Sequence, residues 1–222
     1  MRNDVCIAVY THQNRSSLWN IFFSRLKKHA PQFPVFAMNN TDEIAAYVEK
    51  ERCHVYSDKE DFSESWKPMC DKMIASGFKY MVFSLEDEIL YADVNIKMFE
   101  ESVQLVESRI NKFSKLIKSG GSEFCFQVGL HNIKDYMDLL TVYPIKRIWD
   151  EQELSIKSMG KYESPIIPEE WVGFKRGLYH YDSKVWPYIA TALDKGKWNS
   201  HEYPSEIQEI FNEFNGGQKI MV

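Results

Sequence analysis

Cysteine is scarce in this chain, and the few cysteines do not form the paired pattern of a metal or redox site. Cys6, Cys53, Cys70 and Cys125 are scattered through 222 residues without a C-x-x-C pair. Three of them lie in apolar, strand-like surroundings. We therefore expect buried free thiols in a reducing compartment rather than a disulfide framework.

Long apolar runs and long runs of one charge sign are also missing. No apolar stretch approaches the roughly 20 residues that cross a bilayer, and the N-terminal segment is too short and too polar for a signal peptide. The 27 Lys and Arg residues are interspersed with 32 Asp and Glu residues, whereas a nucleic-acid binder usually shows a basic face. We expect a soluble cytoplasmic protein with no transmembrane segment and no nucleic-acid partner.

Glycine is missing where nucleotide-binding proteins most often use it. The first predicted strand, Val5–Thr11, runs into His12-Gln13-Asn14-Arg15 and contains neither a dinucleotide fingerprint nor a P-loop. Backbone cradling of a phosphate is therefore excluded at this position. The same absence argues against the sugar-phosphate nucleotidyltransferases, such as pyrophosphorylases, which use a glycine-rich loop after their first strand.

Apolar, strand-like runs alternate with helical patterns four times in the first half of the chain. The first run is continuous and rich in β-branched residues, as in a strand buried on both faces. Such alternation predicts the α/β class, with a mostly parallel sheet flanked by helices. The expected strands are 5–11, 34–38, 53–56 and 79–84, and the expected helices follow Ser16 or Ser17, Thr41 and Asp61. Because Pro68 is tolerated only near the start of a helix, the third helix should begin near Ser65 or Trp66. It should stop at Gly77.

The second half is less regular, and we expect one domain over residues 1–222 with an irregular C-terminal region. A helix after Asp93 carries apolar residues that step by four and three as far as Ile117, and Gly120-Gly121 would end it. The other expected elements are a strand at 123–128, a helix at 133–142, a loop-rich excursion at 143–170, a strand at 172–179, a helix from Asp182 to about Leu193 and a last helix from Ser205 to Phe214.

Polar side chains follow each of the first four predicted strands. Ligands of open α/β sheets bind at the carboxyl ends of the strands. Each polar group alone matches ordinary turn chemistry, and the acids alone match a solvated loop. Their coincidence at successive strand ends favours a polar nucleoside pocket, with an acidic group that needs a cation to hold a diphosphate. The four groups are Thr11 to Arg15, Asn39 to Thr41, Ser57-Asp58 and Glu86-Asp87-Glu88.

This layout resembles that of the nucleotide-sugar glycosyltransferases of the GT-A fold over roughly residues 4–100. In that family the first strand ends on the nucleotide, and Asn, Asp or Thr residues after the second and third strands contact the base and ribose. The fourth strand ends in a D-x-D-type motif that binds Mn²⁺ or Mg²⁺ on the diphosphate. The matching segment here, Phe83–Ile89, carries Glu-x-Glu in place of Asp-x-Asp.

The resemblance implies a metal-dependent glycosyltransferase that moves a sugar from a nucleoside diphosphate, most often UDP, to a hydroxyl of a glycan or other acceptor. Residues 1–100 would bind the nucleotide sugar, and the aromatic-rich residues 101–222 would form the acceptor side. A divalent ion held by carboxylates neutralises the charge that builds on the leaving group. The implied nucleotide contacts are Thr11, His12, Arg15, Asn39, Asn40, Asp58 and Glu86.

The acidic motif is expected to divide its work between two sides of the chain. Strand alternation directs Glu86 and Glu88 to one side and Asp87 to the other. We therefore expect Glu88 to hold Mn²⁺ or Mg²⁺ and Glu86 to assist through the ribose or a bound water. Asp87 would anchor the turn. A late histidine completes the metal shell in some relatives, which implies this role for His201.

An inverting transferase also needs a general base for the acceptor hydroxyl, and the family places an Asp or Glu well downstream of the metal motif. Glu170 stands beside Trp171, an aromatic suited to stacking on a sugar, and Glu202 follows a histidine. Each candidate alone is as well explained as a surface acid. The alternative function is a catalytically silent nucleotide-binding or assembly module of the same fold. The candidate bases are Glu170, Glu202 and Glu206, with Glu169 as a further acid in the same region.

Overall fold

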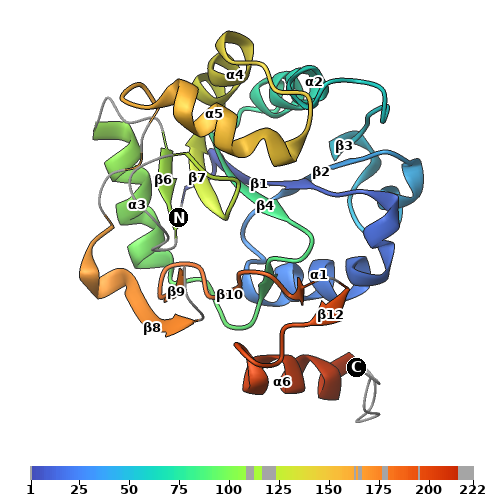
Figure 1. Ribbon diagram of the computed structural model, residues 1–222, viewed down its shortest axis with the longest axis vertical. Coiled ribbons are helices and arrows are strands. Elements are labelled where there is room, and N and C mark those ends of the chain that lie inside the picture. The colour runs from blue at the N-terminus through green and yellow to red at the C-terminus, as the bar shows by residue number, and fades with distance from the viewer. Residues whose placement is uncertain are drawn as a thin grey trace.

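The computed structural model describes residues 2–108, 113–116, 124–162, 164, 167–176, 180–194 and 196–214. Its centre is a six-stranded sheet in the order β3-β2-β1-β4-β7-β6 (Figure 1). The first four strands of this order are parallel, whereas β7 is antiparallel to both of its neighbours. The predicted α/β class with a mostly parallel sheet is therefore confirmed. The strands are β1 (Val5–Tyr10), β2 (Val35–Asn39), β3 (Cys53–Val55), β4 (Tyr80–Leu85), β6 (Phe113–Lys115) and β7 (Gly129–Asn132).

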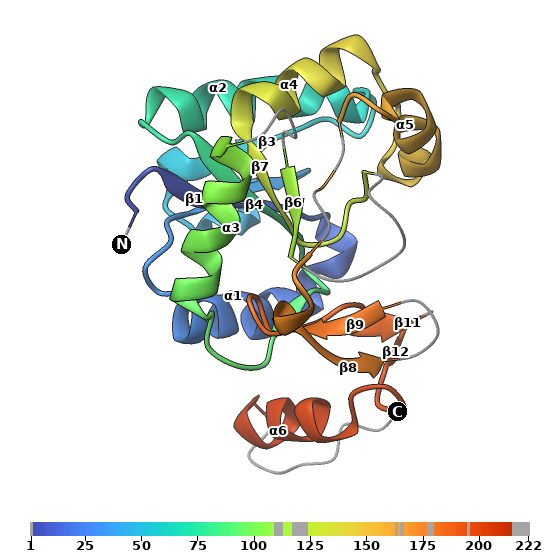
Figure 2. The same ribbon diagram turned by 90° about the vertical axis from the view of Figure 1, so that its left-hand side faces the viewer.

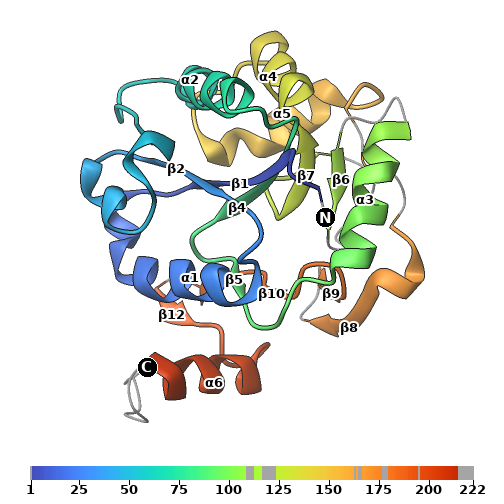
Figure 3. The same cartoon turned by 180° about the vertical axis from the view of Figure 1, so that it is seen from behind.

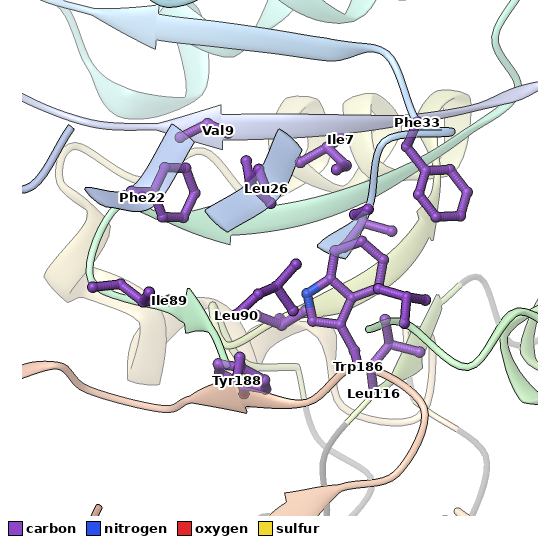
Figure 4. Close-up of a cluster of buried hydrophobic side chains, with 14 of the residues drawn as sticks. Ile7, Val9, Phe22, Leu26, Phe33, Ile89, Leu90, Leu116, Trp186 and Tyr188 are labelled. Carbon is purple, nitrogen blue, oxygen red and sulfur yellow. The ribbon is translucent and has the colours of Figure 1, made fainter. Parts of the chain in front are cut away.

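Helices cover both faces of this sheet (Figure 2). On one face α1 (Ser16–His29) and α3 (Ile96–Ser108) enclose one apolar core, part of which is seen in Figure 4, where side chains of β1 and α1 face Trp186 and Tyr188. The opposite face packs a second core against α2 (Phe62–Ala75), α4 (Ile133–Val142) and α5 (Glu151–Ser158). Strands with apolar residues on both sides read as continuous apolar runs, which is why β1 was recognisable in the sequence.

Short paired strands and a helix follow the sheet in the C-terminal region. β5 (Ile89–Leu90) pairs with β10 (Tyr188–Ile189), β8 (Val172–Arg176) with β9 (His180–Ser183), and β11 (Leu193–Asp194) with β12 (Lys197–Trp198). The last helix, α6 (Pro204–Phe214), matches the helix predicted from Ser205 to Phe214. It lies on the side of α1 that faces away from the sheet (Figure 3). The 3-10 helices are η1 (Gln13–Arg15), η2 (Asp42–Ala46), η3 (Lys50–Arg52), η4 (Ile148–Asp150) and η5 (Glu169–Trp171).

Two predicted helices in the second half are wrong in extent or in kind. The helix predicted to reach Ile117 ends at Ser108, and Phe113 instead begins β6, which pairs with β7. Ile117 and Gly120-Gly121 lie outside the described residues. The helix predicted from Asp182 to Leu193 is absent from that range, where the chain forms β9, β10 and β11. Pro187 interrupts the range, and a proline removes a backbone donor that a helix interior needs.

Other predicted boundaries shift because tertiary pairing overrides the local pattern. The strand predicted at 123–128 is displaced to β7, and the supposed loop at 143–170 contains α5. Of the strand predicted at 172–179, the structure describes β8. Residue 123 and residues 177–179 lie outside the described residues. The segment after Thr41 forms only a 3-10 helix. Helix α2 begins at Phe62, earlier than predicted, and contains Pro68 on its exposed side. Gly77, with φ of +90°, ends that helix as predicted.

All four cysteines are free thiols. Cys6 and Cys70 are buried, while Cys53 and Cys125 are partly exposed. Among the described ranges, no helix is both long enough and apolar enough to cross a membrane.

Candidate functional site

A cavity of about 590 Å³ lies where the carboxyl ends of β1, β3 and β4 meet. The segment that joins α4 to α5 also lines it, as do the two residues that follow β10. Three of the four predicted strand ends therefore supply one cavity. Its lining residues are Tyr10, Thr11, His12, Asn14, Arg15, Tyr56, Ser57, Asp58, Glu60, Phe62, Ser65, Leu85, Glu86, Asp87, Glu88, Phe126, Gln127, Lys146, Arg147, Ile148, Trp149, Glu151, Ala190 and Thr191.

A hydrogen-bonded network joins the ends of β1, β2 and β3 at the rim of this cavity. The Asn40 amide nitrogen donates to Asp58 Oδ2 at 3.2 Å, and its oxygen accepts from the Gln13 backbone N–H at 2.8 Å. His12 Nε2 lies 3.2 Å from Asp58 Oδ1, and the Asn14 N–H donates to His12 Nδ1 at 3.1 Å. Asn40 does not line the cavity itself. Its amide nitrogen contacts both His12 and Asp58, and so it holds these two lining side chains in place.

Thr11 and Asn39 serve the framework more than the cavity surface. The Thr11 hydroxyl accepts a hydrogen bond from Trp19 Nε1 at 2.9 Å, and its carbonyl accepts one from the Tyr56 hydroxyl at 3.0 Å. Asn39 is fully buried, is not a lining residue and donates to the Thr41 hydroxyl and carbonyl. The predicted nucleotide contact from Asn39 is therefore corrected to a role in fixing the turn after β2.

Aromatic rings form one wall beside the β1 and β3 ends. Tyr10 and Tyr56 are stacked, with ring centroids 5.3 Å apart and planes 14° apart, and Phe62 meets Tyr10 edge-on at 5.1 Å. All three residues line the cavity. Burial raises the pKa of Tyr10, so its hydroxyl stays neutral at physiological pH. These rings give the cavity an aromatic wall on this side.

The acidic turn between β4 and β5 places Glu86, Asp87 and Glu88 all on the cavity. The predicted division by strand alternation is wrong because these residues form a turn, not a continued strand. Glu86 is nearly buried, and burial together with the Asp87 charge raises its pKa to about 7, although Arg15 Nε lies 3.7 Å from Glu86 Oε1. Burial also raises the pKa of Asp87, against the opposing effect of Arg15.

Glu88 does not have the surroundings predicted for the principal metal ligand. Its side chain is 2 % exposed, and Oε2 accepts the Leu85 backbone N–H at 2.6 Å. Burial raises the pKa of Glu88 well above its ordinary value, so the neutral acid is favoured. Its hydrogen bonds with Leu85 make Glu88 the residue that closes this turn.

The remaining oxygen donors fit a cation that arrives with a phosphate. Within the described ranges no group of three or more His, Cys, Asp or Glu side chains is arranged to hold a metal ion. Glu86 and Asp87 are two neighbouring carboxylates on the cavity surface. Mg²⁺ is usually bound by one or two carboxylates together with substrate phosphates and waters. The donor set therefore suits Mg²⁺ or Mn²⁺ shared with a ligand, and not a cation held by protein alone.

The four residues predicted from the downstream region are not brought to the cavity. Glu170 is exposed in η5, and Glu206 Oε1 instead accepts a 2.5 Å hydrogen bond from Arg176 Nη2. Glu202 accepts from the Asn199 amide at 2.9 Å, and His201 is an exposed neighbour of Glu202. These side chains belong to the β8–β9 and α6 side of the molecule, so the structure gives no support to their predicted roles as base or metal ligand.

The sequence reasoning missed the wall between α4 and α5. Lys146, Arg147, Trp149 and Glu151 line the cavity, although the segment was interpreted as part of a loop-rich excursion. Glu151 Oε1 accepts the Phe126 N–H at 2.6 Å, and burial raises its pKa. The available signal was local: two adjacent cations stand two residues from a tryptophan in this stretch.

Comparisons with known proteins identify no family. No family model matches the chain, and no curated protein matches it. Among solved structures it is similar to a cytidylyltransferase from Leptospira borgpetersenii serovar Hardjo-bovis, at 13 % identity and a TM-score of 0.49, with all of both chains covered. It is also similar to S. aureus TarS, at 11 % identity and a TM-score of 0.44, over 94 % of this chain and 38 % of TarS. At these values neither likeness bears on activity.

Proposed function

We propose that this chain is a glycosyltransferase that moves a sugar from a nucleoside diphosphate sugar to a hydroxyl acceptor. The observation that carries the proposal is the convergence of a stacked tyrosine pair, neighbouring carboxylates and cations in one cavity at the strand ends. Ligand pockets for small molecules commonly span about 300–1,000 Å³. A cavity of about 590 Å³ is therefore large enough for a nucleotide sugar.

The nucleoside is assigned to the β1 and β3 side of the cavity. The Tyr10 and Tyr56 rings form an aromatic wall there, and His12 and Asp58 supply polar groups at the rim. Asn40 fixes these two polar groups relative to each other through its contacts with both strand ends. The GT-A resemblance implies nucleotide contacts for the same His12 and Asp58, whereas Asn39 and Asn40, for which it implies the same role, do not line the cavity.

Glu86 and Asp87 are the carboxylates proposed to hold Mn²⁺ or Mg²⁺ together with the diphosphate. A bound divalent cation would supply neutralisation of the charge that develops on the leaving diphosphate. Arg15, which lies beside Glu86, adds positive charge at the same place. Glu88 supports this pair indirectly, because its hydrogen bond to Leu85 closes the turn that carries both carboxylates.

The acceptor side needs a group that takes a proton. In the transfer step the acceptor oxygen bonds to the anomeric carbon while the bond from that carbon to the diphosphate oxygen breaks, and the electron pair leaves with the nucleoside diphosphate. The hydroxyl proton passes to a base. Glu60 and Glu151 line the cavity outside the acidic turn, and burial raises the pKa of Glu151, which suits it to accept a proton. We assign the base to Glu151.

A nucleotide panel tests this proposal. Thermal unfolding is measured with UDP, GDP and CMP, each with and without Mn²⁺, for the wild type and Asp87→Asn. A matched control is Asp138→Asn, which changes an exposed acid on α4 that does not line the cavity. We expect one nucleoside diphosphate to raise the melting temperature more with Mn²⁺ than without, and Asp87→Asn alone to abolish the increment due to the metal.

Transfer itself is measured by nucleoside diphosphate release from the corresponding nucleotide sugar. Glu151→Gln is expected to slow release strongly while nucleotide binding persists. Absence of a thermal shift with every nucleotide contradicts the proposal. Nucleotide binding without any release, from every donor sugar and acceptor tried, favours the silent binding module instead.

A further inference from the structure

The cavity carries more acidic than basic side chains, yet it is proposed to take an anionic ligand. Its acids are Asp58, Glu60, Glu86, Asp87, Glu88 and Glu151, against the cations Arg15, Lys146 and Arg147. Arg15 already lies 3.7 Å from Glu86. Lys146 and Arg147 form no ion pair with any residue that the structure describes. Among the residues that the structure describes, these two side chains are thus the cations of the cavity without an ion-pair partner.

The backbone that carries these cations is fixed, although their side chains are exposed. The Phe62 N–H donates to the Lys146 carbonyl at 2.9 Å. Next to it, the buried Ile145 donates its N–H to the Ser63 hydroxyl at 2.8 Å and accepts from the Ser63 N–H at 3.2 Å. The start of α2 thus holds the segment in place. Fixing the backbone in advance lowers the entropy lost when the side chains bind a ligand.

Trp149 adds a planar surface beside the two cations. It lines the cavity, yet its side chain is 76 % exposed. Tryptophan is enriched at binding interfaces because its ring combines a large apolar area with a polar N–H. The combination of a flat ring with adjacent cations suits a ligand in which a ring is joined to phosphate groups.

We infer that Lys146, Arg147 and Trp149 form the wall that binds the diphosphate of the nucleotide sugar and the ring adjoining it. This inference rests on the proposed function, because that function supplies the ligand class. The guanidinium of Arg147 can meet two phosphate oxygens at once, whereas Lys146 acts as a point charge. Because the acidic turn and this wall line the same cavity, a cation held by the acids and the two basic side chains would hold the diphosphate together.

Calorimetric titrations with inorganic pyrophosphate and with UDP test the wall in the presence of Mg²⁺. The double variant Lys146→Ala/Arg147→Ala is expected to weaken both ligands by about tenfold or more, since each hydrogen bond to a charged group contributes substantially to affinity. Trp149→Ala removes the surface placed against the ribose ring next to the diphosphate, so it is expected to weaken UDP more than pyrophosphate. Added salt should weaken pyrophosphate binding more steeply in the wild type than in the double variant.

Matched controls separate this wall from general charge and surface effects. Lys97→Ala/Lys134→Ala removes the same charge from exposed positions on α3 and α4, and Phe174→Ala removes an exposed ring on β8; none of these residues lines the cavity. Equal weakening by the control and test double variants overturns the inference. The inference is also overturned if the wild type binds UDP and the test variants bind it with unchanged affinity. If the wild type binds pyrophosphate through the wall but no nucleotide, the wall stands and the proposed nucleotide function fails.

Discussion

Leu85 and Glu88 exchange two hydrogen bonds across the acidic turn. The Leu85 N–H donates to Glu88 Oε2 at 2.6 Å, and the Glu88 N–H donates to the Leu85 carbonyl at 3.2 Å. Glu88 is almost fully buried, while Asp87 between them is partly exposed on the cavity. The third acid of the turn thus shapes the backbone, and the first two acids face the ligand site.

Glu88→Ala is expected to lower the free energy of unfolding by about 2–4 kcal/mol, because it leaves a buried N–H unpaired and opens a void. Glu88→Gln keeps the shape and an acceptor oxygen, so a smaller loss is expected. Urea unfolding at neutral pH measures both. A Glu88→Ala protein of unchanged stability that has lost only its Mn²⁺-dependent response would restore Glu88 as a metal ligand.

His131 is expected to destabilise the protein as the pH falls. Its ring is stacked on Phe113 with centroids 5.1 Å apart, and burial lowers its pKa from 6.5 to about 3. Between these values the unfolded chain binds the proton and the folded chain does not, so stability is present above pH 6.5 and is lost as the pH falls. The loss is up to about 1.4 kcal/mol per pH unit.

His131→Phe removes this titration and keeps a ring in the aromatic cluster. The free energy of unfolding is measured from pH 7 to pH 4 for both proteins, whose other titrating groups are shared. The difference between them should change by about the stated slope below pH 6.5. A difference in unfolding free energy that is constant over this range would show that His131 binds its proton equally in the folded and the unfolded chain.

Glu86 should have the opposite pH dependence in protein freed of divalent metals. Its folded pKa, about 7, lies above the ordinary value of 4.5, so its contribution to stability is present below pH 4.5 and is lost as the pH rises through 7. Glu86→Gln is therefore expected to gain about 2–3 kcal/mol relative to the wild type between pH 5 and pH 8. Urea unfolding at these two pH values tests this, and a pH-independent difference would contradict it.

Arg25 on α1 connects α6 to the segment at β5 through hydrogen bonds and an ion pair. Its fully buried guanidinium donates to the Leu90 and Tyr91 carbonyls at 2.9 and 3.0 Å and pairs with Glu213 at 2.5 Å. Arg25→Met keeps the apolar stem but removes every donor, so we expect a loss of about 2–4 kcal/mol. Glu213→Gln, at the more exposed end of the pair, should cost about 1 kcal/mol or less. Equal effects in urea unfolding would mean that the carbonyl contacts contribute little.

The sequence predicted those elements whose local pattern and tertiary setting agree. β1 and β4 are buried on both faces, so their apolar runs are continuous, and helix α2 ends at a glycine with positive φ. The pattern failed where pairing with a distant strand decided the outcome. Phe113 has helical spacing to its predecessors, yet it lies in β6 because β7 pairs with it.

The candidate site divides in the same way. His12 and Asp58 were found because ligands of open sheets gather at strand ends, which is a rule of topology. The orientation of Asp87 was mispredicted, because strand alternation does not apply within a turn, and all three acids line the cavity. Lys146 and Trp149 could not be placed, since only folding brings the segment after α4 against the start of α2.

A structure of the chain crystallised with UDP and Mn²⁺ tests the central claim most directly. We predict a nucleotide in the strand-end cavity, with the base on the Tyr10–Tyr56 side and the diphosphate between Asp87 and the wall of Lys146 and Arg147. A nucleotide bound elsewhere on the molecule, or a cavity that stays empty at saturating UDP, would contradict the account.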